Sequence, residues 1–351
     1  MKIRSAPHPC FSRKRNFVFY LTILLIFLGM ASTEALSDTS SDLAACAKIG
    51  DDLLRLKCYD NLSGRKPAEP APAKDLGETP SPTKYQEISY FSKLWELDPE
   101  TRRGKYVIAP HRSNYVLPLT YNDSPNVAAV READPGKDLK RPEVKFQLSL
   151  KTKLWQDILG GKMDLWFGYT QQSFWQFYNF DDSSPFRETN YEPELLLNFR
   201  TDYRLLGGRG RFLNVGFNHQ SNGQSEPLSR SWNRIVANAG FEKGSFSLLL
   251  KGWYRIPESA EDDDNPSMGK YLGYGEIWGY YFWKGNRFGI MFRNNADFHN
   301  NRSTLQAEWS FPLLERVSGY VQYFYGFGEN LLDYNYRVNR IGIGVILKDW
   351  N

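Results

Sequence analysis

Residues 144–151 read VKFQLSLK, so every second residue is apolar and the residues between them are polar. Successive side chains of a β-strand point to opposite faces, so this segment has one apolar and one polar face. The same alternation returns in later segments, namely 195–200, 213–218, 305–311, 317–327 and 341–347. Counting such segments from residue 105 to the C-terminus gives about twelve strands. The sequence therefore predicts an all-β domain.

The composition leaves two kinds of β-protein open. Mean hydropathy is -0.54, with 24% charged and 15% aromatic residues. A soluble β-sandwich has such values, and so does a transmembrane barrel, whose strands alternate apolar and polar residues. The net charge of +4 is spread without a Lys/Arg-rich block, which gives no support to nucleic-acid binding. No 18-residue apolar run occurs in the strand region, so helical spans are excluded there.

The N-terminus has the pattern of an export signal. Basic residues up to Arg15 precede the apolar run 17–30, and small residues follow at 31–35. This pattern predicts that residues 1–35 are a signal peptide cleaved near Ala35. The alternative is a retained membrane anchor, but a spanning helix needs roughly 20 apolar residues.

Residues 36–84 are expected to form a periplasmic extension outside the barrel. The part up to residue 63 looks helical, and 66–84, KPAEPAPAKDLGETPSPTK, is a Pro-rich linker. Cys46 and Cys58 remain after signal removal, and in an oxidising compartment they suggest a disulfide, the alternative being two free thiols. The barrel domain is then 85–351.

A soluble sandwich would show the same alternation, but the export signal and the absence of a helix-forming stretch in about the last 245 residues favour the membrane. The sequence therefore predicts a twelve-stranded antiparallel transmembrane β-barrel that crosses the bacterial outer membrane many times. A closed barrel has no sheet edge, so none of its strands presents a row of unpaired backbone N–H and C=O groups to lipid. The inward face would carry polar side chains that largely fill the lumen, among them Lys145, Lys151, Arg200, Gln306, Glu308 and Gln322. Aromatic residues near strand ends would suit the two membrane interfaces, namely Trp155, Trp175, Tyr191, Tyr203, Tyr254, Trp283 and Trp350.

His219 is the histidine whose neighbours suggest chemistry. Ser221 lies two residues away, on the same face of a strand. Continuing the alternation of 213–217 turns that face toward lipid, where unpaired polar groups are costly. The alternative is that the strand has left the membrane and both side chains are solvated. The alternation alone favours this alternative.

The following strand adds a third group. If Ile235 and Ala237 face lipid, Asn233 does too, and in a hairpin that opposes 219 and 233 it lies beside His219. A hydroxyl, an imidazole and an amide would then meet. Ser221 would be the nucleophile, His219 the general base and Asn233 the group that orients the imidazole.

The residues around this trio resemble a known family. Residues 217–234, FNHQSNGQSEPLSRSWNR, and 183–193, SSPFRETNYEP, are similar to the bacterial outer membrane phospholipase A (detergent-resistant phospholipase A) family. The resemblance covers about 105–348. It implies a calcium-dependent phospholipase A1/A2, a carboxylic ester hydrolase that also takes lysophospholipids and is activated by homodimerisation. Membrane phospholipids would be the substrate.

The resemblance also implies roles for individual residues. Ser221, His219 and Asn233 match the catalytic trio. One calcium ion (Ca2+) per active site would lie at the dimer interface, held by Ser229, by the backbone carbonyl of residue 224, and by Ser183 from the partner subunit. The family has an arginine at the carbonyl position, and this chain has Gln224. A backbone ligand survives that change, whereas any role of the side chain is put in doubt.

Gln171 is expected to face lipid, since it continues the alternation of 165–171. An amide in hydrocarbon favours a polar partner, and the resemblance places a subunit-interface glutamine here. The alternative is a position at the headgroup level. The acidic run 262–264 is interpreted as a solvated loop, with weak calcium binding as the alternative.

The main rival function is a porin-like barrel with an unrelated polar rim. Long extracellular loops folding into a wide lumen would favour it. We expect short loops apart from those near 178–190 and 256–269, which weakens the porin interpretation.

Overall fold

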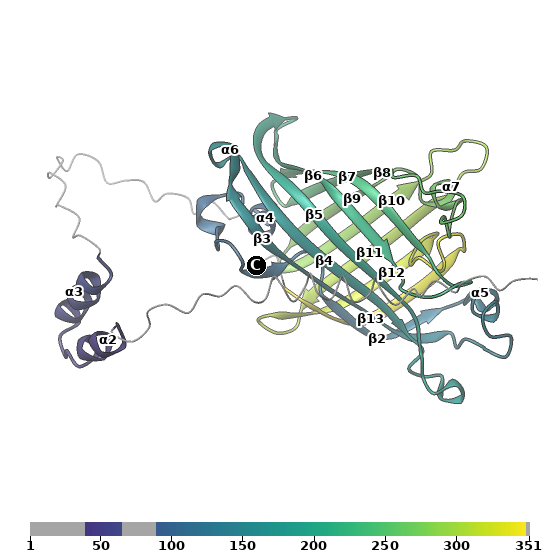
Figure 1. Ribbon diagram of the computed structural model, residues 1–351, viewed down its shortest axis with the longest axis horizontal. Coiled ribbons are helices and arrows are strands. Elements are labelled where there is room, and N and C mark those ends of the chain that lie inside the picture. Colours follow the sequence, from purple (N-terminus) through teal and green to yellow (C-terminus); the bar gives the residue numbers. More distant parts are fainter. Residues whose placement is uncertain (1–38, 65–88, 349–351) are drawn as a thin grey trace, which may run out of the picture. The chain divides into compact units, whose positions relative to one another are not determined.

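The computed structural model describes residues 39–64 and 89–348 and divides the chain into two units, Met1–Thr83 and Lys84–Asn351 (Figure 1). The signal peptide expected at 1–35, the whole Pro-rich linker and Trp350 lie outside the described residues.

The described part of the first unit is a pair of helices, α2 (Thr39–Ala47) and α3 (Asp52–Leu62). Asp51 caps α3, because its carboxylate accepts hydrogen bonds from the amides of Leu53 and Leu54. Cys46 and Cys58 form a disulfide with their Cα atoms 5.6 Å apart. The disulfide ties the end of α2 to the middle of α3.

The second unit is built on thirteen strands joined by turns and loops. They are β1 (Ile108–Pro110), β2 (Tyr115–Asn122), β3 (Pro142–Asp157), β4 (Met163–Trp175), β5 (Phe186–Leu205), β6 (Gly208–Ser221), β7 (Ser231–Lys243), β8 (Phe246–Arg255), β9 (Gly275–Trp283), β10 (Asn286–Asn294), β11 (Ser303–Pro312), β12 (Val317–Gly326) and β13 (Val338–Leu347). Helical turns occur at α4 (Tyr90–Trp95), η1 (Pro99–Thr101), α5 (Val127–Arg131), α6 (Ile158–Gly161), η2 (Phe180–Asp182) and α7 (Met268–Leu272). Among the described residues no helix is both long and apolar enough to cross a membrane.

The strands form one closed antiparallel ring. Neighbours in sequence pair from β2 to β13, and the ring closes where β13 pairs with β2. The short strand β1 pairs with the same edge of β3 as β2 does, so it continues β2 beyond a break. The prediction of a twelve-stranded barrel is therefore confirmed.

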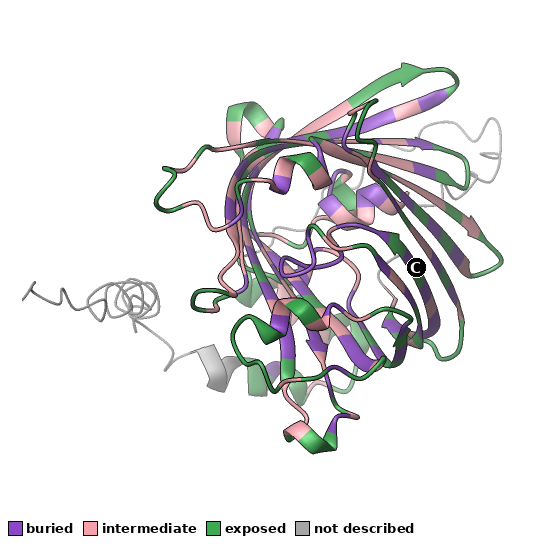
Figure 2. Ribbon diagram, turned by 90° about the vertical axis from the view of Figure 1, so that its right-hand side faces the viewer, coloured by how far each residue is buried: buried purple, intermediate pink, exposed green. Residues whose placement is uncertain are grey.

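The two faces of the wall differ as the alternation predicts. Along β6, Leu213, Val215 and Phe217 are exposed, whereas Asn214 and Asn218 are buried. Figure 2 shows this alternation of burial along many strands. Of the residues predicted to line the lumen, Lys145, Lys151, Glu308 and Gln322 are buried and Arg200 and Gln306 are half-buried. Of the predicted interfacial aromatics, five are exposed and Trp175 is half-buried; the exposed ones are Trp155, Tyr191, Tyr203, Tyr254 and Trp283.

The two ends of the barrel have different connections. Turns such as 206–207, 244–245 and 284–285 lie at one end, together with the start of β2 and the end of β13. The loops at the other end are longer. In outer-membrane barrels the short turns face the periplasm and the long loops face outward, and we assign the ends accordingly.

The periplasmic half of the lumen is filled by α4, an element for which the sequence offered no periodic signal. Ser89 caps it by accepting a hydrogen bond from Ser92 N. Phe91 and Trp95 pack against inward-facing side chains of four successive strands, namely Trp166, Leu196, Phe212 and Val236. Phe91 N also donates to Glu242 Oε1 at 2.8 Å. These contacts hold the helix inside the ring.

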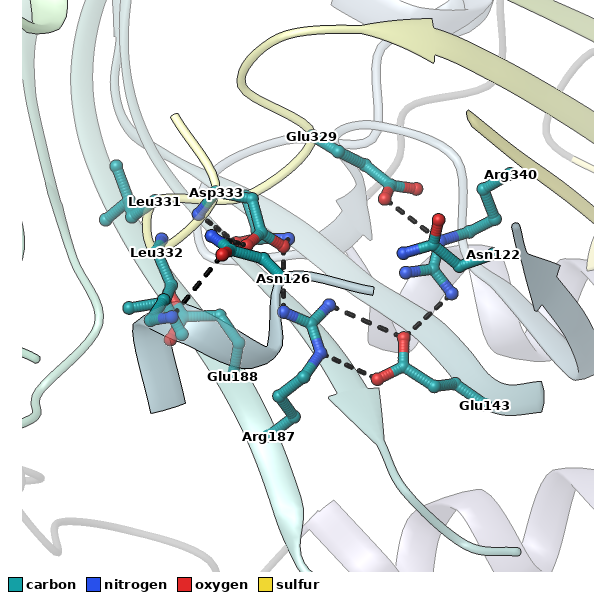
Figure 3. Close-up of polar contacts among 12 residues, drawn as sticks. Asn122, Asn126, Glu143, Arg187, Glu188, Glu329, Leu331, Leu332, Asp333 and Arg340 are labelled. Atoms are coloured by element: carbon teal, nitrogen blue, oxygen red, sulfur yellow. Dashed lines mark hydrogen bonds and ion pairs between the residues drawn. The ribbon is translucent and has the colours of Figure 1, made fainter. Parts of the chain in front are cut away.

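The outer half of the lumen is filled by the β12–β13 loop, 327–337. Figure 3 shows Asp333 of this loop paired with Arg187, and Glu329 paired with Arg340. Glu143 of β3 lies between the two arginines, 2.6 Å from Arg187 and 2.8 Å from Arg340. The expectation that only two loops are long is wrong, because 123–141 and 327–337 are also long. The latter occupies the outer half of the lumen and, together with α4, lines a cavity of about 230 Å³. This filling argues against the porin-like interpretation.

Candidate active site at the extracellular rim

The hairpin β6–β7 brings the predicted trio to the end of the barrel with the long loops. Its register pairs His219 with Asn233 and Ser221 with Ser231. The hypothesis that 219 and 233 are opposed across this hairpin is therefore confirmed. One step toward the membrane, Phe217 pairs with Ile235, and both side chains are exposed. The trio thus lies on the lipid-facing side of the wall, directly above apolar surface.

His219 and Asn233 form a direct side-chain contact. His219 Nδ1 lies 2.8 Å from Asn233 Oδ1. Because an amide oxygen can only accept, Nδ1 carries the proton in this arrangement, and Nε2 presents a lone pair. This is the tautomer that a general base needs. In the part of the chain that the structure describes, no hydrogen bond joins Ser221 Oγ to the imidazole; such contacts often tighten only with substrate.

Tyr191 lies beside the trio, and sequence reasoning had assigned it only to the interfacial aromatics. It pairs with Ser221 across β5–β6 and with Gln171 across β4–β5. Its ring lies next to Gly223, where an added Cβ would meet it at 3.3 Å. The row Gln171, Tyr191, Ser221 therefore runs along three neighbouring strands on the outer face.

The inner face beneath the trio is a connected polar layer. Glu192 accepts hydrogen bonds from Asn218 at 2.8 Å and from Arg234 at 2.9 Å. Trp232 Nε1 donates to Gln220 Oε1 at 2.8 Å. Apart from Glu192, which lies on β5, these side chains belong to the residues that alternate with the trio along β6 and β7, and the layer links the three strands.

The two loops at this rim contact each other. Ser229, in the β6–β7 loop, donates a hydrogen bond to the carboxylate of Asp264, in the β8–β9 loop. Asp263 accepts from Arg255 at 2.6 Å. The interpretation of 262–264 as a solvated loop is therefore wrong for Asp263 and Asp264. Gln224 donates from its side chain to Glu188 Oε2 at 2.8 Å, so its amide is engaged on the lumen side.

Glu258, which sequence reasoning missed, contacts Asn233 from the β8–β9 loop. Asn233 Nδ2 donates to Glu258 Oε1 at 2.9 Å. The loop around Glu258 is irregular, so no periodicity could have indicated which of its acidic residues reaches β7.

The other predicted site residues lie away from the trio within one chain. Ser183 is exposed in the β4–β5 loop, and no hydrogen bond among the described residues joins it to Ser229. Gln171 faces outward and is half-buried, with weak contacts at 3.3 Å to Tyr169 and Ser173. Over the described residues, no group of three or more His, Cys, Asp and Glu side chains could hold a metal ion.

The remaining described histidines are not part of the site. His111 is buried in the lumen, with Nε2 2.7 Å from Glu194. His299 lies in the exposed β10–β11 loop, where its amide donates to Asp297.

Comparison with known proteins gives concordant matches. A family described as Phospholipase A1 matches residues 91–347. The chain is 39% identical over 245 residues to the phospholipase A1 of Escherichia coli strain K12, which covers 70% of this chain and 82% of that protein. It is 35% identical over 347 residues to a putative phospholipase A1 of Neisseria meningitidis serogroup B, with 87% and 90% covered.

Solved structures match over the same region. Outer membrane phospholipase A from Escherichia coli superposes with a TM-score of 0.68 and 36% identity, covering 76% of this chain and 100% of that one. The Salmonella typhi outer membrane phospholipase, solved as a dimer with bound calcium, gives the same TM-score and identity over 76% of this chain and 99% of that one.

Proposed function

The chain belongs to the phospholipase A1 family and is an ester hydrolase of the outer membrane, and we propose that it cleaves phospholipids by a calcium-dependent Ser-His-Asn mechanism activated by dimerisation. It would remove acyl groups from both glycerol positions, and from lysophospholipids. The observation that carries the proposal is the His219–Asn233 contact beside Ser221 on the lipid-facing side of the wall.

The chemistry follows from the protonation that Asn233 imposes. His219 Nε2 accepts the proton of Ser221 Oγ as the oxygen attacks the acyl carbonyl. The C–O bond to glycerol then breaks, the imidazolium gives its proton to the departing oxygen, and the acyl group remains on Ser221. In the second half, a water loses a proton to His219 and attacks the acyl ester. The fatty acid leaves and Ser221 recovers its proton.

The position of the site accounts for a lipid substrate. Phe217 and Ile235 present exposed apolar side chains directly below His219 and Asn233. An acyl chain lying against them stays in hydrocarbon while its ester group reaches Ser221. Transfer of the chain into water, which costs about 0.8 kcal/mol per CH₂, is avoided.

The rim loops offer the oxygen donors that calcium prefers. Ser229 and the carboxylate of Asp264 lie within hydrogen-bond distance of each other, and the carbonyl of Gln224 belongs to the same β6–β7 loop. Hydroxyl, carboxylate and carbonyl oxygens suit a hard cation, so the residues fit. A calcium ion held there would polarise the ester carbonyl and stabilise the oxyanion. One chain offers few ligands, which supports a second contribution from Ser183 of another copy.

Dimerisation is supported by the row of residues on the outer face. Gln171 makes only weak contacts within its own barrel, so its amide is available to another polar group. It is separated from Ser221 by Tyr191 alone. Only β5 would therefore separate a second barrel bound at Gln171 from the strand that carries Ser221. Such a barrel would complete both the calcium site and an acyl cleft.

Labelling with a long-chain alkyl sulfonyl fluoride tests this proposal. In detergent with calcium we expect covalent modification of Ser221, found by mass spectrometry of peptides, together with loss of fatty acid release. Removal of calcium should prevent both modification and activity.

Two variants make the test specific. Ser221→Ala should lose more than about 1000-fold in activity. Ser231→Ala removes the hydroxyl that is paired with Ser221 in register, and it should still be labelled. Full activity in Ser221→Ala, or equal labelling of Ser221 with and without calcium, would contradict the proposal.

A further inference from the structure

Asn233 is held from both sides. Its Oδ1 faces His219 Nδ1 at 2.8 Å, and its Nδ2 donates to Glu258 Oε1 at 2.9 Å. The three side chains come from β6, from β7 and from the loop after β8, so a continuous chain of contacts leads from the imidazole to a carboxylate. We propose that Glu258 is a positioning residue of the catalytic site, which fixes the Asn233 amide in the one orientation that makes His219 a base. This inference rests on the Ser-His-Asn mechanism proposed above.

The physical reason is the near symmetry of an amide. Turning the Asn233 side chain by 180° exchanges Oδ1 and Nδ2 with little change in shape. In the turned orientation, an NH₂ group would face His219, and Nδ1 would have to accept. The ring proton would then lie on Nε2, and the imidazole could not take the proton of Ser221. An orienting asparagine therefore needs a second contact that distinguishes its two ends.

A carboxylate makes that distinction. Ionised glutamate has acceptors and no donor, so it contacts the NH₂ end and repels the oxygen end. Its negative charge also favours an imidazolium two side chains away, which compensates in part for the neutral asparagine. The charge-assisted hydrogen bond from Nδ2 is stronger than one between neutral groups.

Glu258 itself is held in place. Its side chain is 18% exposed, and it lies 3.6 Å from Arg255 Nη2. The same guanidinium pairs with Asp263 and donates to the carbonyl of Asn265. The amide of Ile256 donates to the carbonyl of Asn233 at 2.8 Å, which fixes the start of the loop against β7.

Two other roles for Glu258 lead to different results. It could belong to the calcium site, since Asp264 lies in the same loop, or it could only stabilise the loop through Arg255. Glu258→Gln separates these roles, because it keeps the size of the side chain, removes the charge and adds a donor. Glu261→Gln is the matched control, since Glu261 is exposed in the same loop.

At saturating calcium we expect Glu258→Gln to lower kcat about tenfold with KM unchanged. The acidic limb of its pH–rate profile should move to lower pH, because the imidazolium loses a nearby negative charge. Glu261→Gln should match the wild type in kcat, KM and pH profile. Folding of each variant is checked by its heat-modifiable migration in gel electrophoresis.

A double-mutant cycle with Asn233→Ala then tests the pathway. If Glu258 acts through Asn233, adding Glu258→Gln to Asn233→Ala should cause no further loss. Additive losses, a defect that higher calcium removes, or an effect equal to that of Glu261→Gln would each overturn the positioning role. Activity in Ser221→Ala would instead overturn the proposed mechanism, so the two failures are distinguishable.

Discussion

Charged groups inside the barrel and polar groups at its outer rim are organised in opposite ways. In the lumen, Glu143 is contacted by Arg187, Arg340 and Gln176, all within 2.8 Å. At the rim, His219 contacts Asn233, whose amide donates to Glu258, so the contacts form a single chain. Among the described residues, no hydrogen bond reaches Ser221 Oγ. The lumen therefore has the denser network of ion pairs, although we propose no catalytic role for it.

The difference agrees with the role proposed for each region. A carboxylate surrounded by guanidinium groups is stabilised in one protonation state, and this suits a group that must hold the β12–β13 loop inside the ring. A catalytic base has to gain and lose a proton in each cycle, so its neighbours must orient the ring without holding it in one charge state. In this protein, the densely paired charges of the lumen therefore have a structural role, which is to hold the β12–β13 loop inside the barrel.

The largest effect is expected for Arg340→Ala, which tests the structural role of the lumen network. The change leaves Glu329 and Glu143 buried with one cation fewer, and we expect a loss of about 3 kcal/mol in the free energy of unfolding. Urea denaturation in lipid vesicles measures it. Activity per folded molecule should be unchanged.

Arg316→Ala, in the exposed β11–β12 turn, is the control for this change, and it should stay within about 0.5 kcal/mol of the wild type. Equal stability of the two variants would mean that the lumen network does not hold the barrel together.

An effect of intermediate size is expected for Ser229→Ala, which should change the calcium requirement of the activity but not the stability. Loss of one oxygen donor should raise the calcium concentration for half-maximal activity about tenfold, with the unfolding transition unchanged. A calcium titration of fatty acid release measures it. Ser225→Ala, exposed in the same loop, should behave like the wild type. A normal calcium response in Ser229→Ala would remove this residue from the metal site.

The smallest effect is expected for Gln171→Leu. Hydrogen bonds between side chains in a membrane contribute about 0.6 kcal/mol on average, so the dimer should weaken by about threefold. Analytical ultracentrifugation in detergent with calcium measures the dimerisation constant, with Ile290→Leu on the lipid-facing side of β10 as the control. Unchanged dimerisation would place the interface elsewhere.

The sequence predicted the parts of the molecule in which apolar and polar residues alternate regularly. Alternation at 144–151 and 213–218 indicated the strands and their faces, and the same alternation placed His219, Ser221 and Asn233 on one side. Their opposition across the hairpin was a hypothesis that the register of β6 and β7 then confirmed. The family resemblance supplied the proposed roles, which alternation alone could not.

Features without a period were missed. Glu258 lies in an irregular loop, and only the path of that loop brings it to Asn233. The helix α4 is six residues long, too short to show a repeat, and the apolar side chains that bury it lie on strands more than 70 residues away. The entry of 327–337 into the lumen likewise depends on charges on distant strands.

The position of α4 has a consequence for the order of folding. Phe91 and Glu242 are joined although 151 residues separate them, and contacts of such long range form slowly. The buried surface that receives α4 includes side chains of four successive strands, from β4 to β7, so it is complete only after those strands have paired. Residues near the start of the chain must therefore wait for strands that follow them, and the first part of this unit to be synthesised is among the last to reach its final place.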